Sequence, residues 1–222
     1  MSAAGSLPGG PPAGPPDGTA WPPPAAGARE QVRAAALALP DLAALAVAAR
    51  GCTACPELAA TRRQVVPGAV PAGARLLVLG EAPGAQEDER GLPFVGRSGQ
   101  LLDALLAEVG VDRADVGVLN TVKCRPPGNR PPTRPESATC RGWTERQLEL
   151  AAPAVVVALG LSAARWFLGP VTLSAVRGRL HEVAGTRVLP TYHPSAALRF
   201  GPQGEPRRLL RDDLALAARA CR

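Results

Sequence analysis

Three side chains that could do acid, base or hydrogen-bond chemistry stand at the ends of three apolar runs. Glu81 follows the first run, Asn120 lies in the second and His193 ends the last. A carboxylate can orient or deprotonate water or stabilise a cation, and an imidazole can donate a hydrogen bond to a developing anion. An asparagine amide presents a donor and an acceptor together, which matches the edge of an amide-like heterocycle. The three residues indicate a site for a flat, hydrogen-bonding group beside which charge develops.

The loop that begins at Gly80 is rich in glycine, proline and acids and runs GEAPGAQEDERGLPFVG. A glycine-rich turn after a strand often cradles a phosphate. Neither G-x-x-x-x-G-K-[ST] nor G-x-G-x-x-G follows here, however, and Glu81 would repel phosphate. Glu87 adds a second acid to the loop. Phe94 offers a flat face for stacking, and the alternative is an aromatic anchor packed in the core.

Four of the five cysteines form a set: Cys52 and Cys55 in a C-x-x-C turn, Cys124 after a strand pattern and Cys140 at the start of a helix. In an intracellular protein disulfides are disfavoured, so a metal or redox role is expected. Four thiolates suit Zn²⁺ or an iron–sulfur cluster, and the spacing does not choose between them. The alternative is that some are buried apolar cysteines. Cys221 lies outside the set and is expected to be a free thiol.

Between Cys124 and Cys140 runs RPPGNRPPTRPESAT, which is too rich in proline for a helix or strand until its end. Ligation at both ends would pin this loop. Arg125, Arg130 and Arg134 would then lie along one surface and could follow a phosphate backbone. The alternative is a solvated loop.

The elements that must position these residues alternate between strand and helix patterns. Apolar runs typical of strands cover 74–80, 116–122, 154–160 and 186–194. Helical periodicity covers 99–110, 135–153, 162–167 and 206–220, and two more helices are expected before residue 52, with a break at Pro40. The alternation predicts an α/β fold of three layers, with a central, mostly parallel four-stranded sheet flanked by helices. Function should then lie beyond the carboxyl ends of the strands.

The composition indicates where the folded domain begins and which kind of molecule the protein binds. Residues 1–27 hold a large share of the proline and glycine and are expected to form a disordered tail, which leaves 28–222 as the folded domain. The tail lacks the basic start of a signal peptide, and no run approaches the roughly 18 apolar residues of a membrane span. A soluble protein of the cytoplasm is expected. The net charge of +6 suits a polyanion such as nucleic acid, although the near absence of lysine indicates a composition bias that would also produce it.

Three segments resemble one known family when they are taken together with the four cysteines. They are GEAPGAQEDERGLPFVGRSGQLLD, LNTVKCRPPGNRPPT and LPTYHPSAALR, and the resemblance covers about residues 50–219. The family is the family 4 uracil-DNA glycosylases, prokaryotic base-excision-repair enzymes with a [4Fe–4S] cluster. The resemblance implies a uracil-DNA glycosylase fold and hydrolysis of the bond between uracil and deoxyribose. The implied partner is uracil-containing DNA, single- or double-stranded, and a monomer is expected.

The resemblance also implies roles for individual residues. Glu81 lies beside the scissile bond, with Glu87 as the second catalytic candidate, and His193 faces the uracil carbonyl that gains charge. The implied substrate-binding residues are Gly80, Ala82, Phe94, Asn120 and Leu198. Phe94 would stack on the base, and Asn120 would read its edge. The implied cluster ligands are Cys52, Cys55, Cys124 and Cys140.

Leu198 would fill the gap that a flipped base leaves in the duplex, and its alternative is a leucine on a helix face. Which acid handles the water is left open. Position 195 is serine where many family members have alanine, and little is expected from this difference.

Single features of the sequence argue against two related glycosylase families. One related family lacks an acid in the first loop, which Glu81 argues against. Another traps the sugar with a histidine in a loop whose counterpart after Cys124 holds no histidine. Two alternatives stay open: a related glycosylase with broader specificity for deaminated bases, and a metal-stabilised DNA-binding protein without enzymatic activity.

Overall fold

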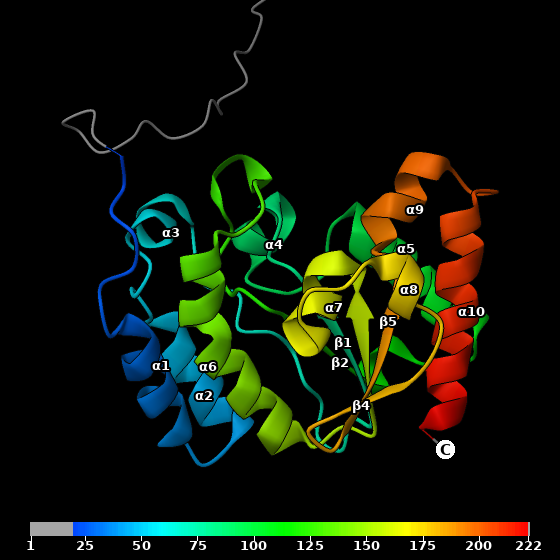
Figure 1. The fold of residues 1–222 in the computed structure, drawn as a ribbon, viewed down its shortest axis with the longest axis horizontal. Helices are drawn as coiled ribbons and strands as arrows, with labels where there is room; N and C mark the ends of the chain where they lie inside the picture. The colour runs from blue at the N-terminus through cyan, green and yellow to red at the C-terminus, as the bar shows by residue number, and fades with distance from the viewer. Residues whose placement is uncertain (1–19, 222) are drawn as a thin grey trace, which may run out of the picture.

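A five-stranded sheet lies at the centre of the computed structural model, which describes residues 20–221 (Figure 1). The strand order is β2-β1-β3-β5-β4. The strands are β1 (Leu76–Gly80), β2 (Val116–Asn120), β3 (Val155–Leu159), β4 (His181–Val183) and β5 (Thr186–Thr191). The first four in the spatial order run parallel, and β4 pairs with β5 antiparallel. The prediction of an α/β fold with a central, mostly parallel sheet is confirmed.

The sheet has one strand more than the four that the sequence predicted. β4 returns to β5 through a tight turn at Ala184 and Gly185, whose φ angles are 47° and 79°. This strand is three residues long and partly exposed at the sheet edge, so it has no apolar run to reveal it. His181 is partly buried within β4.

Helices surround the sheet on both faces (Figure 1). They are α1 (Ala28–Leu37), α2 (Leu42–Arg50), α3 (Pro56–Thr61), α4 (Ala85–Arg90), α5 (Arg97–Glu108), α6 (Arg134–Ala151), α7 (Gly160–Leu168), α8 (Leu173–Val176), α9 (Pro194–Phe200) and α10 (Glu205–Ala220). Two 3₁₀ turns, η1 (Arg113–Asp115) and η2 (Pro127–Asn129), precede β2 and α6. The predicted break at Pro40 separates α1 from α2, where Asp41 caps α2 by accepting from the amide of Ala44 at 2.8 Å.

The apolar core has two parts. The strands β1, β2 and β3 are buried at every position, which explains their continuous apolar runs. Leucines of α5 and α10 pack on one face of the sheet, and apolar residues of α6 and α7 pack on the other. A separate cluster joins α1, α2 and α3 to α6 and includes the four cysteines of the predicted set. This arrangement places the cysteines beside the sheet, near the carboxyl end of β2.

The ends of the chain bear on two predictions. Of the predicted tail, residues 1–19 lie outside the described residues, and α1 begins at Ala28, the first residue of the predicted domain. Among the described residues, no helix combines the length and apolar character needed to cross a membrane.

Candidate active site

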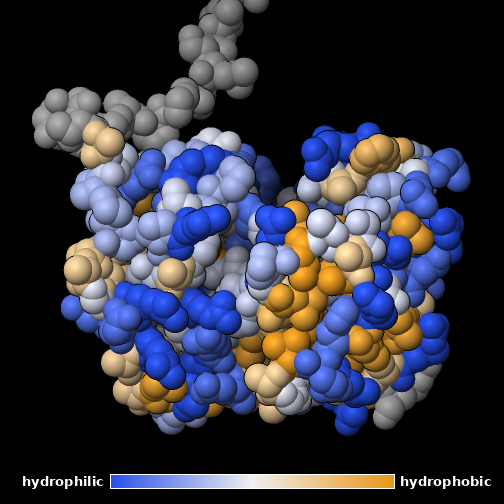
Figure 2. Space-filling model, in the orientation of Figure 1, coloured by the Kyte–Doolittle hydropathy of each residue, from blue (hydrophilic) through white to orange (hydrophobic). Residues whose placement is uncertain are grey.

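The carboxyl ends of the parallel strands meet around a pocket of about 580 Å³. The pocket opens at the top of the molecule as drawn in Figure 2, between the part that carries α3 and α4 and the part that carries α9. The structure brings six predicted site residues to its wall: Glu81, Ala82, Glu87, Phe94, Asn120 and His193. Gly80 and Leu198 do not line it. The parallel sheet explains this convergence, because every strand finishes at the same edge.

Asn120 is fixed by its backbone and leaves its side-chain oxygen free. It is 2% exposed, and its carbonyl accepts hydrogen bonds from Lys123 Nζ at 2.7 Å and Thr144 Oγ1 at 3.3 Å. Its Oδ1 is buried and accepts no hydrogen bond from any described residue. A buried acceptor without a partner costs free energy, so this atom indicates that a donor on a ligand completes it.

Gly80 makes the close approach between Asn120 and Phe94 possible. A Cβ at position 80 would lie 2.4 Å from Asn120 Oδ1 and 2.6 Å from Phe94 Cζ. Neither distance is compatible with a side chain. Gly80 therefore acts by leaving room behind the pocket wall, instead of contacting a ligand as a lining residue.

Phe94 joins the core and the pocket. The residue is 7% exposed and packs in the sheet cluster, yet its ring also lines the cavity. The centre of the ring lies 5.8 Å from the centre of the His193 imidazole, at an interplanar angle of 39°. Its φ of 54° is unusual for a bulky residue. The two alternatives for Phe94, a stacking face and a core anchor, are thus compatible.

His193 precedes α9 and is held by the first turn of that helix. Its Nδ1 accepts a hydrogen bond from the amide of Ser195 at 3.1 Å and lies 2.9 Å from Ser195 Oγ. Because Nδ1 is an acceptor, the proton of the neutral ring belongs on Nε2. Burial lowers the pKa of His193 to about 4; nearby Glu87 opposes this shift and Arg199 adds to it. At neutral pH the site therefore presents an uncharged imidazole with an N–H donor.

The carboxylate of Glu87 accepts hydrogen bonds from backbone amides of its own loop. Its Oε1 accepts from the amides of Val95 and Gly96, both at 2.9 Å, and its Oε2 accepts from the amide of Gly84 at 3.1 Å. These three hydrogen bonds tie together the loop between Gly84 and Gly96. The catalytic role predicted for Glu87 stays a prediction.

Glu81 keeps a carboxylate available at the pocket wall. Ser162 Oγ in the first turn of α7 donates to Glu81 Oε2, and the backbone carbonyl of Glu81 accepts from Thr121 Oγ1 at 2.7 Å. Oε1 forms no hydrogen bond with the described residues. Sequence reasoning missed Ser162, although its place just after β3 could have identified it, because that strand ends at the same edge as the others.

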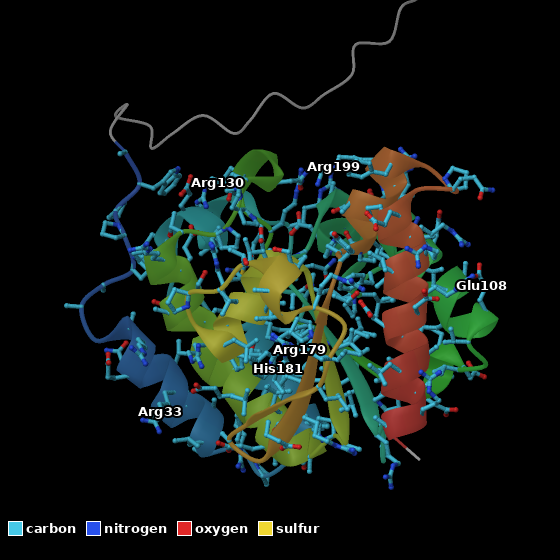
Figure 3. All side chains as sticks on the ribbon, turned by 45° about the vertical axis from the view of Figure 1, so that its right-hand side comes forward. Arg33, Glu108, Arg130, Arg179, His181 and Arg199 are labelled. Carbon is cyan, nitrogen blue, oxygen red and sulfur yellow. The ribbon has the colours of Figure 1, made fainter. Side chains whose placement is uncertain are left out.

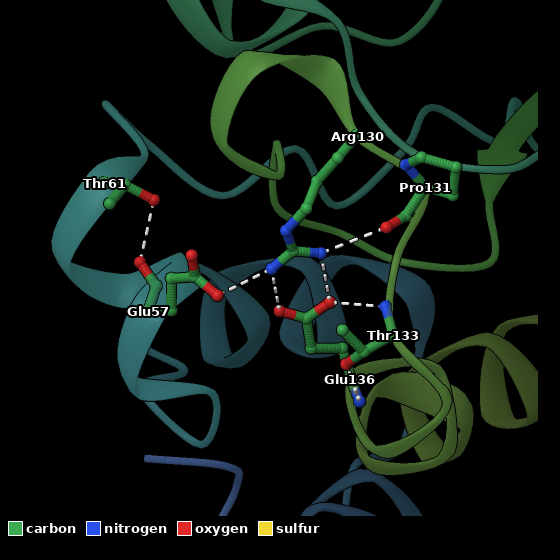
Figure 4. A network of polar contacts seen from close by, with 6 residues as sticks. All are labelled: Glu57, Thr61, Arg130, Pro131, Thr133 and Glu136. Atoms are coloured by element: carbon green, nitrogen blue, oxygen red, sulfur yellow. Dashed lines mark hydrogen bonds and ion pairs between the residues drawn. The ribbon is translucent and has the colours of Figure 1, made fainter. Parts of the chain in front are cut away.

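Arg130 was predicted to lie with Arg125 and Arg134 along one surface, but its side chain joins three segments instead (Figure 4). Its Nη2 lies 2.7 Å from both Glu57 Oε2 of α3 and Glu136 Oε1 of α6, and its Nη1 donates to Glu136 Oε2 at 2.9 Å. Glu136 also accepts from the amide of Thr133 at 2.7 Å, in the capping box of α6. Arg130 lines the pocket as well, so it connects the pocket to the segment after Cys55.

The four cysteines of the set surround one enclosed space. Cys52, Cys55, Cys124 and Cys140 all line it, and each has a free thiol. Within residues 20–221, no group of three or more His, Cys, Asp or Glu side chains could hold a single metal ion. The space between the four thiols measures about 10 Å³. Cys221 lies apart, against the carbonyl of Arg75.

Hydrogen-bond donors already face these sulfurs. Arg62 Nη1 donates to Cys124 Sγ at 3.2 Å, and the amide of Lys123 donates to Cys140 Sγ at 3.3 Å. Burial raises the pKa of the Cys124 thiol to about 12 and that of Cys140 to about 11. Burial and the neighbouring thiols raise the pKa of Cys55 still further. The thiolates that ligate metals would thus need a cationic centre among them.

Leu198, the predicted wedge, lies on α9 beyond the pocket and is 36% exposed. Phe200, at the end of the same helix, is 69% exposed. Sequence reasoning did not identify Phe200. The two apolar side chains stand on α9, the helix that His193 caps, and both are available to a bound molecule larger than the pocket.

Comparisons with known proteins agree with these features. The model of the uracil DNA glycosylase superfamily matches residues 67–215. The chain is 45% identical over 166 residues to the type-4 uracil-DNA glycosylase of Thermotoga maritima, covering 73% of this chain and 85% of that protein. It is 42% identical over 156 residues to the type-4 uracil-DNA glycosylase of Archaeoglobus fulgidus, covering 66% and 78%. A type-5 uracil-DNA glycosylase of Mycobacterium leprae is 34% identical over 204 residues, covering 73% and 88%.

Proposed function

Because the chain belongs to the uracil-DNA glycosylase superfamily and is a uracil-DNA glycosylase, we propose that the pocket of Glu81, Asn120 and His193 performs the reaction. The enzyme hydrolyses the N-glycosidic bond of uracil in DNA and leaves an abasic site for base-excision repair. The observation that supports this pocket most directly is the buried, unpartnered Oδ1 of Asn120. The higher identity to type-4 relatives supports placing the chain in that family.

Asn120 selects the base in this proposal. Uracil must leave the duplex stack to reach the pocket, at a cost of a few kcal/mol. Its N3–H would donate to Asn120 Oδ1, and the amide NH₂ of Asn120 would donate to the neighbouring carbonyl of the base. Cytosine presents an unprotonated N3 and an amino group along the same edge, so acceptor would face acceptor and donor would face donor. Phe94 would stack on the ring.

His193 stabilises the leaving group. As the glycosidic bond breaks, uracil gains negative charge on the carbonyl oxygen next to that bond. The Nε2–H of a neutral imidazole donates to this oxygen without a proton transfer, and one such preorganised donor is worth about 3 kcal/mol. The hydrogen bond from Ser195 keeps the ring in the tautomer that this role needs.

Glu81 acts on the sugar side. Deoxyribose passes through a cation-like state, which a nearby carboxylate stabilises, and the same group can orient the attacking water. Ser162 holds one oxygen of Glu81 and leaves the other for the reaction. Glu87 supports the reaction by fixing the loop through backbone amides.

The function is tested by incubating the protein with oligonucleotides that contain a single uracil, cytosine, thymine or hypoxanthine, followed by alkali to break abasic sites. Strand breaks are expected with uracil and not with cytosine or thymine. Cleavage at hypoxanthine as well would support the broader-specificity alternative. Binding without a break at any base would support the non-enzymatic alternative and contradict the pocket's proposed role.

Replacing Glu81 by glutamine is expected to lower kcat by about a hundredfold or more, because the neutral amide can neither deprotonate water nor stabilise a cation. Replacing Ser162 by alanine removes only the hydrogen bond that orients the carboxylate and should cost roughly fivefold. Single-turnover assays with excess enzyme measure both effects. Equal losses in the two variants would contradict the division of roles between Glu81 and Ser162.

A [4Fe–4S] cluster is the cofactor that we propose for Cys52, Cys55, Cys124 and Cys140. Support comes from the single space that all four thiols line and from the N–H donors that face the sulfurs of Cys124 and Cys140. When bound, the cluster supplies a structural cross-link and takes no part in the hydrolysis. These cysteines join the segment before α3, the end of β2 and the start of α6.

Anaerobically purified protein is therefore expected to be brown and to contain iron and inorganic sulfide in equal amounts. Replacing Cys124 by serine should remove both and lower the Tm, and replacing Cys221 by serine serves as the matched control that changes neither. Zinc without sulfide in the wild-type protein would contradict the cluster. That the enzyme is a monomer of the prokaryotic cytoplasm stays a prediction.

A further inference from the structure

A second cavity, of about 830 Å³, adjoins the active-site pocket and is lined mainly by residues of α6 and α7. Glu81 and Ser162 line both cavities, so the two adjoin at these hydrogen-bonded side chains. We call the second cavity the α6–α7 groove. None of the roles proposed above for uracil or for the cluster uses it.

Four arginines line the α6–α7 groove: Arg29, Arg134, Arg141 and Arg165. The acidic residues along it are Glu81, which belongs to the active site, and Glu145, which pairs with Arg141 at 2.7 Å. Within residues 20–221, the other three arginines form no ion pair. The groove therefore has an excess of positive charge that no described acid neutralises.

Contacts within the protein also hold two of these arginines, Arg141 and Arg165, in place. The guanidinium of Arg141 lies 4.1 Å from the centre of the Trp166 ring, and its Nη1 donates to the Trp166 carbonyl at 3.2 Å. Arg165 donates its Nε to the carbonyl of Val171 at 3.0 Å, which leaves its two terminal nitrogens free. Arg29 and Arg134 are exposed on α1 and on the first turn of α6. Charged donors thus face the groove from three helices.

We propose that the α6–α7 groove binds phosphates of the DNA strand beyond the two nucleotides that flank the flipped uracil. A strand with its uracil in the pocket has to continue past Glu81 and Ser162, where the groove begins. Guanidinium groups bind phosphates through paired N–H donors, and an electropositive groove beside a reactive base is typical of proteins that hold single-stranded nucleic acid. The proposal rests on the function proposed above and adds a path for the substrate.

The test compares the double variant R134Q/R165Q with the double variant R33Q/R179Q on single-stranded substrates. The two variants lose the same charge, and the control arginines are exposed and do not line the groove. Figure 3 labels Arg33 and Arg179, which lie away from Arg130 and from the end of the molecule where the pocket opens. One substrate is a trinucleotide with a central uracil, and the others extend it on the 5′ or the 3′ side.

For the wild-type enzyme, kcat/KM is expected to rise when one of the two sides is extended. At low salt, R134Q/R165Q should have a kcat/KM about tenfold below that of the wild type on the extended substrate. On the trinucleotide the two enzymes should have equal kcat/KM. For R134Q/R165Q, the plot of log kcat/KM against log salt should be less steep by about 1.4 with the extended substrate, because each phosphate contact to a single strand contributes about 0.7. R33Q/R179Q should behave as the wild type does.

Equal losses on the trinucleotide and the extended substrates, or equal losses in both double variants, would overturn the α6–α7 groove as the strand's path. If the wild-type enzyme cleaves none of the uracil substrates, the proposed function fails first, and that result is distinct from failure of the groove.

Discussion

Replacing His193 by alanine is expected to lower kcat for uracil excision by about a hundredfold to a thousandfold, which is the usual cost of removing one preorganised donor. The site contributes a neutral Nε2–H, because the amide of Ser195 occupies Nδ1 and burial lowers the pKa of His193 to about 4. The loss should appear in kcat more than in KM, since the hydrogen bond strengthens only as uracil gains charge. Single-turnover rates at saturating enzyme measure it.

The same histidine predicts a pH dependence of stability. Its pKa is 6.5 in the unfolded chain and about 4 in the folded one. As the pH falls from about 6.5 toward 4, the unfolded chain binds a proton that the folded protein excludes, so the free energy of unfolding decreases. Urea titrations of the wild type and of H193A across this range should differ in slope, with the flatter profile in the variant. An H193A enzyme that retains full activity would contradict the mechanism, and so would a wild-type kcat that titrates near 6.5.

Replacing Arg130 by methionine is expected to lower the free energy of unfolding by about 2 kcal/mol, because the buried carboxylate of Glu136 would lose the charged donor that it shares with part-exposed Glu57. Glu136 would lose both of its bonds from Arg130, with a side chain that is only 5% exposed, and Glu57 would lose its bond as well. Arg130 also lines the pocket, so kcat/KM should fall together with the stability.

The matched control is the replacement of Arg125 by methionine, because Arg125 lies in the same loop and donates only to Asn129. That change should cost well under 1 kcal/mol. The effect of R130M should also depend on pH. Burial alone would raise the pKa of Glu136, but the bonds from Arg130 and Thr133 outweigh it and lower that pKa below 4.5. The stability from this pair is therefore present above pH 4.5 and is lost as the pH falls through the lowered value. A difference between R130M and the wild type that does not shrink in acid would contradict the role of the pair.

The sheet and the convergence of its site residues were predictable, because strands buried on both faces are continuous apolar runs and parallel strands finish at one edge. Glu81, Asn120 and His193 could be placed together by this argument. β4 could not be predicted, because an exposed edge strand of three residues has no pattern of its own. The backbone contacts of Glu87 could not be predicted either, because an acid that accepts from three amides and an acid that faces a substrate look the same in a sequence.

The arginines of the proline-rich loop show more sharply what the sequence cannot predict. Arg130 and Arg134 belong to one proline-rich loop, but one turns inward to two glutamates and the other faces the α6–α7 groove. Composition identifies such a loop as basic, and only the packing of α3, α6 and α7 decides where each charge goes.

The short segment 120–124 connects the active-site pocket to the cysteines, which bears on how oxidation would affect the enzyme. Lys123 is 1% exposed; its side chain bonds to the carbonyl of Asn120, and its amide bonds to the sulfur of Cys140. Lys123 therefore links Asn120, which we propose reads the base, to one of the four thiols. We expect oxidation of Cys140 to shift Asn120 through this link and so to weaken the discrimination between uracil and cytosine. Cleavage assays at uracil and at cytosine after oxidant treatment, followed beside the melting temperature, test this expectation.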